Sequence, residues 1–141
     1  MLRNLTNIYV NRFFSTQTST SIVNITNTAW EKINDILLKS NSQGMLFSIK
    51  SGGCNGFNYN FEVLNDKNSD LLNNKLKPTC IENDSSKVYI DPLAEMYLIG
   101  TTIDYIKEDY SKGVYENKFV YIADKERATN CGCGVSFSPK I

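Results

Sequence analysis

The stretch Met45-Leu-Phe-Ser-Ile-Lys-Ser-Gly-Gly-Cys54-Asn-Gly-Phe57-Asn-Tyr-Asn-Phe-Glu-Val63 decides the fold. It opens with a run of strand length, Met45 to Lys50. From Phe57 to Val63, large apolar residues alternate with Asn and Glu, which is the period of a strand with one buried face. A turn with three glycines and Cys54 separates the two runs. The sequence therefore predicts two consecutive strands joined by a glycine-rich turn that carries a thiol.

A helix is predicted immediately before these strands, over residues 29–40. Thr28-Ala29-Trp30-Glu31 fits the capping box, in which a threonine hydroxyl and a glutamate satisfy free backbone donors at a helix start. Apolar residues recur at helical spacing, at Ala29, Trp30, Ile33, Ile36 and Leu37. We expect this face to pack on the sheet and the helical pattern to stop at Gly44.

The chain after the second strand is polar before it becomes strand-like again. Residues 65–86 are rich in Asn, Asp, Lys and Ser and predict a long exposed connection, with a short strand around Cys80. Val88 to Ile90 then predicts a further short strand.

The C-terminal half continues with short elements. Asp91 and the proline after it predict the start of a brief helix that ends at Gly100. Two strands are expected near residues 102–106 and 118–122. The remaining residues, 123–141, have weak periodicity and predict a tail without regular structure.

The composition suits one compact domain. A chain of 141 residues with 41% apolar content is long enough for one domain and too short for two of ordinary size. The 15 basic and 15 acidic residues cancel, and no basic stripe is interleaved with aromatic residues, so nucleic acid is not an expected partner. No apolar run is long enough to span a bilayer, so no membrane association is expected.

The chain has no histidine and four cysteines, Cys54, Cys80, Cys131 and Cys133. The lack of an imidazole excludes the Ser-His-Asp and Cys-His nucleophile systems and the histidine-rich zinc sites. Any soft metal must therefore be bound by cysteine. In a chain without a secretory signal, thiols are usually reduced and serve metal binding or redox chemistry.

Residues 1–22 have the composition of a mitochondrial transit peptide. No Asp or Glu occurs from Met1 to Trp30, while two arginines and a Ser/Thr-rich tract are present. Arg12-Phe13-Phe14-Ser15 resembles a matrix-protease cleavage site. We predict a transit peptide over 1–22, a folded domain over 23–141 and a location in the mitochondrial matrix. A disordered tail of accidental composition is the alternative.

Two glycine-rich segments present three of the thiols. Cys131-Gly132-Cys133-Gly134 places two of them on one short segment, and the glycines let the backbone aim both inward. The glycines around Cys54 allow the main chain to approach an inorganic core closely, and amides in such loops can donate hydrogen bonds to sulfide. The plainer alternative for Cys54 is a tight turn with a small buried residue.

Gly52-Gly53-Cys54-Asn55-Gly56-Phe57, followed by Cys131-Gly132-Cys133-Gly134 and Ser136-Phe137, resembles the A-type iron-sulfur cluster carriers, the IscA/HesB-like family. The resemblance covers nearly everything from Ile25 onward, residues 98–105 included. Val135 departs from it, because the family commonly has a polar or acidic residue there. The resemblance implies an α+β, HesB-like domain of mixed, mostly antiparallel strands, with an N-terminal helix, a short second helix and a flexible cysteine-bearing C-terminal tail.

The same resemblance implies that Cys54, Cys131 and Cys133 bind a [2Fe-2S] or [4Fe-4S] cluster, or iron, and it gives no such role to Cys80. Both clusters ordinarily take four protein ligands, so one chain is a ligand short. We therefore expect a cluster shared across a homodimer or a hetero-complex with another A-type carrier. The protein would pass its cargo on and would not act as an enzyme.

The partners that the resemblance implies belong to the maturation of mitochondrial [4Fe-4S] proteins. A scaffold or a monothiol glutaredoxin would donate the cluster, a helper with the folate-binding fold would assist, and apo [4Fe-4S] proteins would receive it. Two alternatives stay open at this point. One is a structural zinc module in which Cys80 or an oxygen supplies a fourth ligand, and the other is a thiol-disulfide oxidoreductase that uses Cys131 and Cys133, although the chain lacks a Cys-X-X-Cys motif.

Overall fold

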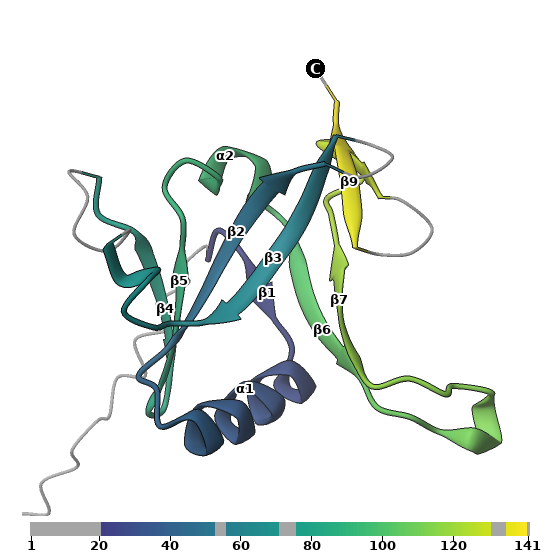
Figure 1. Ribbon diagram of the computed structural model, residues 1–141. Helices are drawn as coiled ribbons and strands as arrows, with labels where there is room; N and C mark the ends of the chain where they lie inside the picture. Colours follow the sequence, from purple (N-terminus) through teal and green to yellow (C-terminus); the bar gives the residue numbers. More distant parts are fainter. Residues whose placement is uncertain (1–20, 53–55, 71–75, 131–134, 141) are drawn as a thin grey trace, which may run out of the picture.

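The computed structural model describes residues 21–52, 56–70, 76–130 and 135–140, and Figure 1 shows how they are arranged. In chain order the elements are β1 (Asn24–Ile25), α1 (Asn27–Ser40), β2 (Met45–Ser51), β3 (Phe57–Val63), β4 (Thr79–Asn83), β5 (Ser86–Ile90), α2 (Glu95–Leu98), β6 (Thr102–Ile106), the 3-10 helix η2 (Tyr110–Lys112), β7 (Lys118–Ile122), β8 (Ala128–Asn130) and β9 (Ser136–Pro139). The predicted transit peptide lies outside the described residues, apart from its last two.

The strands form two sheets. The larger has the order β4-β5-β2-β3-β9-β8, and the smaller has the order β1-β6-β7. Only β1 with β6 and β2 with β5 pair in parallel among the described strands. β2 and β3 pair along their whole length, from Met45 opposite Val63 to Ser51 opposite Phe57. The predicted class, α+β with mostly antiparallel strands in one domain, is confirmed.

The start of α1 differs from the prediction. Thr26 is the N-cap, and its hydroxyl accepts a hydrogen bond from the Ala29 amide at 3.2 Å, so the capping box predicted at Thr28 is wrong by two residues. The same hydroxyl donates to the Asp104 carboxylate at 2.5 Å, and the Thr26 amide donates to the Ile103 carbonyl at 3.0 Å. The pairing of β1 with β6 therefore fixes where the helix begins.

The end of α1 also differs. Asn41 adopts a left-handed conformation, with φ of 51°, and its amide bonds back to a carbonyl of the last turn. Asn41, not Gly44, therefore stops the helix. Gly44 has another reason to be glycine, because a Cβ atom there would lie 2.8 Å from the Tyr89 ring and 3.0 Å from the Lys87 carbonyl oxygen. It lets the chain enter β2 directly beside β5.

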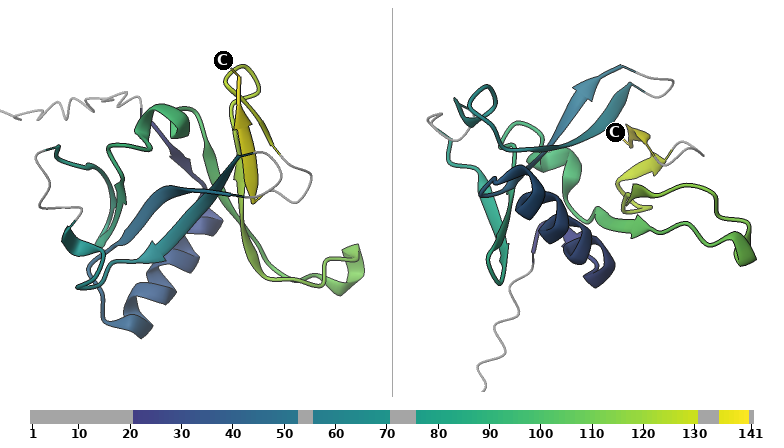
Figure 2. Two further views of the ribbon diagram at one scale, coloured as in Figure 1. Left: turned by 45° about the horizontal axis from the view of Figure 1, so that its top comes forward. Right: turned by 60° about the horizontal axis from the view of Figure 1, so that its bottom comes forward.

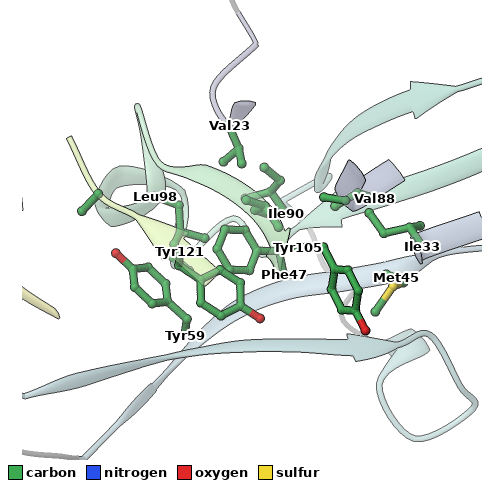
Figure 3. Packing of buried hydrophobic residues seen from close by; sticks show 14 of the residues in the cluster. Val23, Ile33, Met45, Phe47, Tyr59, Val88, Ile90, Leu98, Tyr105 and Tyr121 are labelled. Atoms are coloured by element: carbon green, nitrogen blue, oxygen red, sulfur yellow. The ribbon is translucent and has the colours of Figure 1, made fainter. Parts of the chain in front are cut away.

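The core lies between α1 and the two sheets. The predicted face of the helix is buried at Ala29, Trp30, Ile33 and Leu37, and Ile36 is partly buried against it. Phe47 on β2 is fully buried at the centre, with its ring centre 5.9 Å from that of Tyr59 and 5.5 Å from that of Tyr121. Figure 3 shows these rings stacked between strands of both sheets.

The C-terminal segment is more ordered than predicted. Its described parts contain β8 and β9, which pair with each other, and β9 also pairs with β3. Phe137 on β9 is fully buried. Strands of three and four residues are too short to show a hydrophobic period, which is why the sequence pattern missed them.

The remaining predictions largely agree with the structure. The strands predicted at 57–63, 102–106 and 118–122 are β3, β6 and β7, and Cys80 lies within β4. The predicted brief helix is shorter, because α2 spans only Glu95–Leu98. Within the described ranges, neither α1 nor any shorter helix has the length and apolar character needed to cross a bilayer.

Replacing Phe47 by alanine tests this description of the core. Phe47→Ala should lower the free energy of unfolding by about 3–5 kcal/mol, because it removes a buried ring and leaves a cavity. Urea denaturation followed by circular dichroism measures the change. Leu38→Ala is the matched control, since Leu38 is 83% exposed on α1 and should change stability by less than about 0.5 kcal/mol. Equal effects of the two substitutions would contradict the placement of Phe47.

Candidate functional site

The residues that flank the two cysteine-bearing segments lie close together in one part of the larger sheet. Phe57 at the start of β3 pairs with Phe137 on β9, and Phe137 pairs with Asn130 at the end of β8. These three residues form one row across three neighbouring strands, so Phe57 and Asn130 lie about 10 Å apart at the usual strand spacing. Figure 1 shows β9 beside the start of β3.

The three predicted ligands, Cys54, Cys131 and Cys133, lie outside the described residues. The ligand assignment therefore stays a prediction.

Two glycines that flank Cys54 have the backbone conformation that the sequence suggested. Gly52 has φ of 135° and Gly56 has φ of 100°, which side chains other than glycine rarely tolerate. The Gly52 amide donates to the Gly56 carbonyl at 2.9 Å and closes the turn. No atom lies within 3.5 Å of a Cβ built at either position, so conformation, not space, requires glycine. Gly53, Gly132 and Gly134 lie outside the described residues.

Tyr59 holds both ends of the segment that carries Cys131 and Cys133. Its amide donates to the Val135 carbonyl at 3.0 Å, and its hydroxyl donates to the Asn130 side-chain oxygen at 3.4 Å. The Asn130 amide group in turn donates to the Tyr121 carbonyl at 3.2 Å. One residue of β3 therefore fixes where this segment leaves the sheet and where it returns.

The chemistry of Tyr59 suits a fixed hydrogen-bond donor. Burial raises the pKa of its phenol to about 12, and the nearby Thr101 hydroxyl partly opposes that rise. The phenol therefore stays protonated at physiological pH and can donate to Asn130 throughout. Its ring also packs on Phe137, with ring centres 4.5 Å apart.

Sequence reasoning missed Tyr59 and Asn130 as parts of the site. The alternation in residues 57–63 placed Tyr59 on the buried face of a strand, but nothing in that pattern gave its partners. The position of Asn130 directly before Cys131 was the only available signal. Its role depends on the register of β8, which the sequence did not reveal.

Cys80 is separated from this part of the sheet. It lies on the edge strand β4, in a row with Tyr89, Leu46 and Glu62. Cys80 itself is three strands across and five residues along the sheet from Phe57, roughly 20 Å at ordinary sheet dimensions. Within one chain, Cys80 therefore lies far from the described flanks of the segments that carry the other cysteines.

The Cys80 thiol is also poorly suited to bind metal. It is exposed, and partial desolvation together with the Glu82 carboxylate, 3.8 Å away, raises its pKa. A raised pKa keeps the thiol protonated, whereas metals bind the thiolate. Among the residues that the structure describes, no group of three or more Cys, Asp or Glu side chains is placed to hold a metal ion.

Comparison with known proteins finds similarity to proteins of iron-sulfur cluster biosynthesis. The family described as "Iron-sulphur cluster biosynthesis" matches residues 22–135. The chain is 36% identical over 118 residues to the iron-sulfur cluster insertion protein ErpA of Mannheimia succiniciproducens, a match that covers 80% of this chain and 90% of that protein.

Two solved structures share the fold. Escherichia coli SufA, which is involved in the biosynthesis of iron-sulfur clusters, aligns with a TM-score of 0.60 at 24% identity, over 82% of this chain and 91% of that one. A crystal structure of IscA with a [2Fe-2S] cluster aligns with a TM-score of 0.64 at 15% identity, over 84% of this chain and 99% of that one. At these identities both comparisons establish the fold alone.

The hydrogen bond from Tyr59 to Asn130 can be tested with Tyr59→Phe, which keeps the ring and removes the hydroxyl. A net hydrogen bond of about 1 kcal/mol predicts about fivefold faster amide hydrogen exchange in residues 128–130, measured by NMR. Tyr121→Phe is the matched control, because Tyr121 contacts Asn130 through its backbone carbonyl and its hydroxyl points away from that of Tyr59 (Figure 3). Equal exchange in both variants would show that the Tyr59 hydroxyl does not hold this end of the segment.

Proposed function

The chain belongs to the iron-sulphur cluster biosynthesis family, and we propose that it carries an iron-sulfur cluster, or iron, and delivers it to acceptor proteins without enzymatic turnover. Cys54, Cys131 and Cys133 supply the thiolates. The observation that carries this proposal is the row Phe57, Phe137 and Asn130, because it joins the flanks of both cysteine-bearing segments at one place in the sheet.

The surroundings of these segments suit a cargo that must leave again. The residues that flank them are small or uncharged: Ser51, Gly52, Gly56, Asn130, Val135 and Ser136. The core is built around Phe47, two strands away from β9, so the fold does not need a metal as its centre. A bound cluster can therefore be released without loss of the hydrophobic core.

Transfer proceeds by exchange of ligands. A deprotonated thiol of the acceptor forms a bond to iron while a bond from iron to a carrier thiolate breaks, and the departing thiolate takes up a proton. No electron is transferred, so the step needs no oxidant or reductant. Because one chain provides three of the four usual ligands, we propose that the cluster is shared by two chains, in a homodimer or a complex with another A-type carrier.

We further propose that the protein acts in the mitochondrial matrix. The acid-free, Arg- and Ser/Thr-containing N-terminal residues support this location, and the family match begins only at residue 22. ErpA of Mannheimia succiniciproducens and SufA of Escherichia coli are bacterial proteins, so the proposed location depends on this chain's own N-terminus. Donors of the scaffold or monothiol-glutaredoxin kind, a helper with the folate-binding fold and apo [4Fe-4S] acceptors are the partners proposed.

Single cysteine substitutions test the ligand set. Cys54→Ser, Cys131→Ser and Cys133→Ser should each abolish stable cluster binding, because each removes one of few ligands, and each should leave the far-ultraviolet circular dichroism spectrum unchanged. The measurement is iron and acid-labile sulfide per chain after anaerobic reconstitution, with Mössbauer spectroscopy to identify the cluster.

Cys80→Ser is the matched control and should load as the unaltered chain does. Full cluster content in any of the first three variants would remove that cysteine from the proposed ligand set. A colourless protein that holds stoichiometric zinc would instead favour a structural zinc module.

The location is tested by import into isolated mitochondria. The full chain should enter in a manner that depends on the membrane potential and should be shortened by the matrix protease. A variant with Arg3→Glu and Arg12→Glu should stay outside, because import requires positive charge in the transit peptide. Equal behaviour of the two chains would contradict the proposed transit peptide.

A further inference from the structure

The short helix α2 and the turn before it present apolar side chains together with two carboxylates. Leu93, Met96 and Tyr97 are 73%, 77% and 40% exposed, and Asp91 and Glu95 on the same stretch are partly exposed. We define these five residues as the α2 surface. Exposed apolar side chains gathered in one region commonly mark a surface that another polypeptide segment covers.

The carboxylates of the α2 surface have no cationic partner among the residues that the structure describes. Asp91 accepts a hydrogen bond from the Leu93 amide at 3.1 Å, and Glu95 accepts one from the Thr79 hydroxyl at 3.1 Å. None of the ion pairs between described residues includes either carboxylate. A segment that complements this surface therefore combines apolar side chains with positive charge.

The first residues of this chain have that character. We define the N-terminal segment as residues 1–14, which contain Arg3 and Arg12 and no Asp or Glu. The segment has the period of an amphipathic helix, and the residues that share its apolar side are Leu2, Leu5, Tyr9 and Phe13. Two positive charges and an apolar side thus match the two negative charges and the apolar side chains of the α2 surface.

The chain that follows the N-terminal segment enters the described fold directly beside α2. The Gly100 amide, two residues after the end of α2, donates to the Ile22 carbonyl at 2.8 Å, and the Asn24 amide donates to the Thr101 carbonyl at 2.9 Å. Figure 2 shows the start of β1 next to α2. Residues 15–21 can span up to about 25 Å, whereas α2 is only about 6 Å long. The chain is therefore long enough to bring the N-terminal segment back onto the α2 surface.

We infer that the N-terminal segment docks on the α2 surface of its own chain. Its apolar side covers Leu93 and Met96, and its two arginines lie toward Asp91 and Glu95. Because the segment is tethered beside α2, docking is a reaction within one chain and does not require a partner at high concentration.

The docked position has a consequence for the proposed function. The Tyr97 ring packs on the Phe57 ring with centres 5.3 Å apart, and Phe57 follows Cys54 by three residues. The uncleaved chain therefore carries its own cover beside one cysteine-bearing segment, and the proposed cleavage in the matrix removes that cover. This consequence rests on the proposed location, whereas the docking itself does not.

Other exposed apolar side chains of the described residues suit the N-terminal segment less well. The rings of Tyr110 and Tyr115 lie on the arm between β6 and β7, which extends away from α2 in Figure 1. Leu38 on α1 is also exposed, but the Asp35 carboxylate on that helix already pairs with Lys39 at 3.0 Å. Neither place combines free carboxylates with the entry point of the N-terminal segment.

The test measures how fast dilute hydrogen peroxide oxidises Met96 in the full chain, followed by mass spectrometry. Met45, which is 3% exposed, serves as the internal standard for an intact core. Tethering gives an effective concentration of about 1 mM. A contact with a dissociation constant of about 0.25 mM is then occupied about 80% of the time and slows the oxidation of Met96 about fivefold.

The variant with Arg3→Glu and Arg12→Glu should oxidise at Met96 about fivefold faster than the unaltered chain, because like charges oppose docking. Lys39→Glu with Lys112→Glu is the matched control. It makes the same change in net charge at lysines that are 73% and 77% exposed on α1 and η2, away from α2 in Figure 1, and should leave the rate unchanged. Thermal melting checks that each variant is folded.

A charge exchange identifies the two surfaces that meet. Asp91→Lys and Glu95→Lys, added to the variant with Arg3→Glu and Arg12→Glu, should restore slow oxidation of Met96, because opposite charges face each other again. The same two lysines in a chain with its natural arginines should give fast oxidation. A change in the fold of α2 alone would not produce this reversal.

Three outcomes would overturn the inference. Equal rates in the unaltered chain and the arginine variant would show that the N-terminal segment does not cover Met96. Protection that increases with protein concentration would show that another copy of the chain covers it. Fast oxidation after the charge exchange would show that the two carboxylates do not receive the arginines. Cluster content and import are measured separately, so the proposed function stands or falls independently of this result.

Discussion

Phe137 is stacked between Phe57 and Tyr59 and fully excluded from solvent, and the geometry of the candidate site depends on this contact. Strands as short as β8 and β9 have little stability of their own. Burial of an aromatic ring contributes about 2–3 kcal/mol, and it fixes the register of β9 on β3. Residues 80 positions apart are thereby joined, and the flanks of both cysteine-bearing segments are brought to the same strands. Without this ring, the C-terminal segment would lose its main apolar contact with β3.

The hydrophobic core of the described residues is built without a metal, which suits the proposed role of the cluster as cargo. Phe47, Tyr121 and the apolar face of α1 form most of this core, and β8 and β9 add Ala128 and Phe137 to it. A domain of this size buries enough apolar surface to fold without a metal. The glycine-rich flanks add conformational freedom but little burial. The core is therefore complete within the described residues, and the proposed exchange of ligands need not disturb it.

Local patterns in the sequence were sufficient for β3, β6 and β7 and for the buried face of α1, because each depends on a period within one segment. They were insufficient wherever a distant residue decides the outcome. Thr26 caps α1 because β1 pairs with β6 and Asp104 binds its hydroxyl, which no capping pattern contains. The role of Asn130 depends on the register between β8 and β9. The cysteine motifs predicted which chemistry to look for, while the row through Phe57 and Phe137 was needed to show that their flanks meet.

The proposed shortage of one ligand per chain has a thermodynamic consequence. If two chains share one cluster, binding of the cluster and binding of the second chain are linked, and each strengthens the other by the same factor. A large apolar interface would hold the chains together whether or not the cluster was present. A pair held mainly by bonds to the cluster would separate when the cluster leaves. Each chain would then be able to load again, as the proposed carrier role requires.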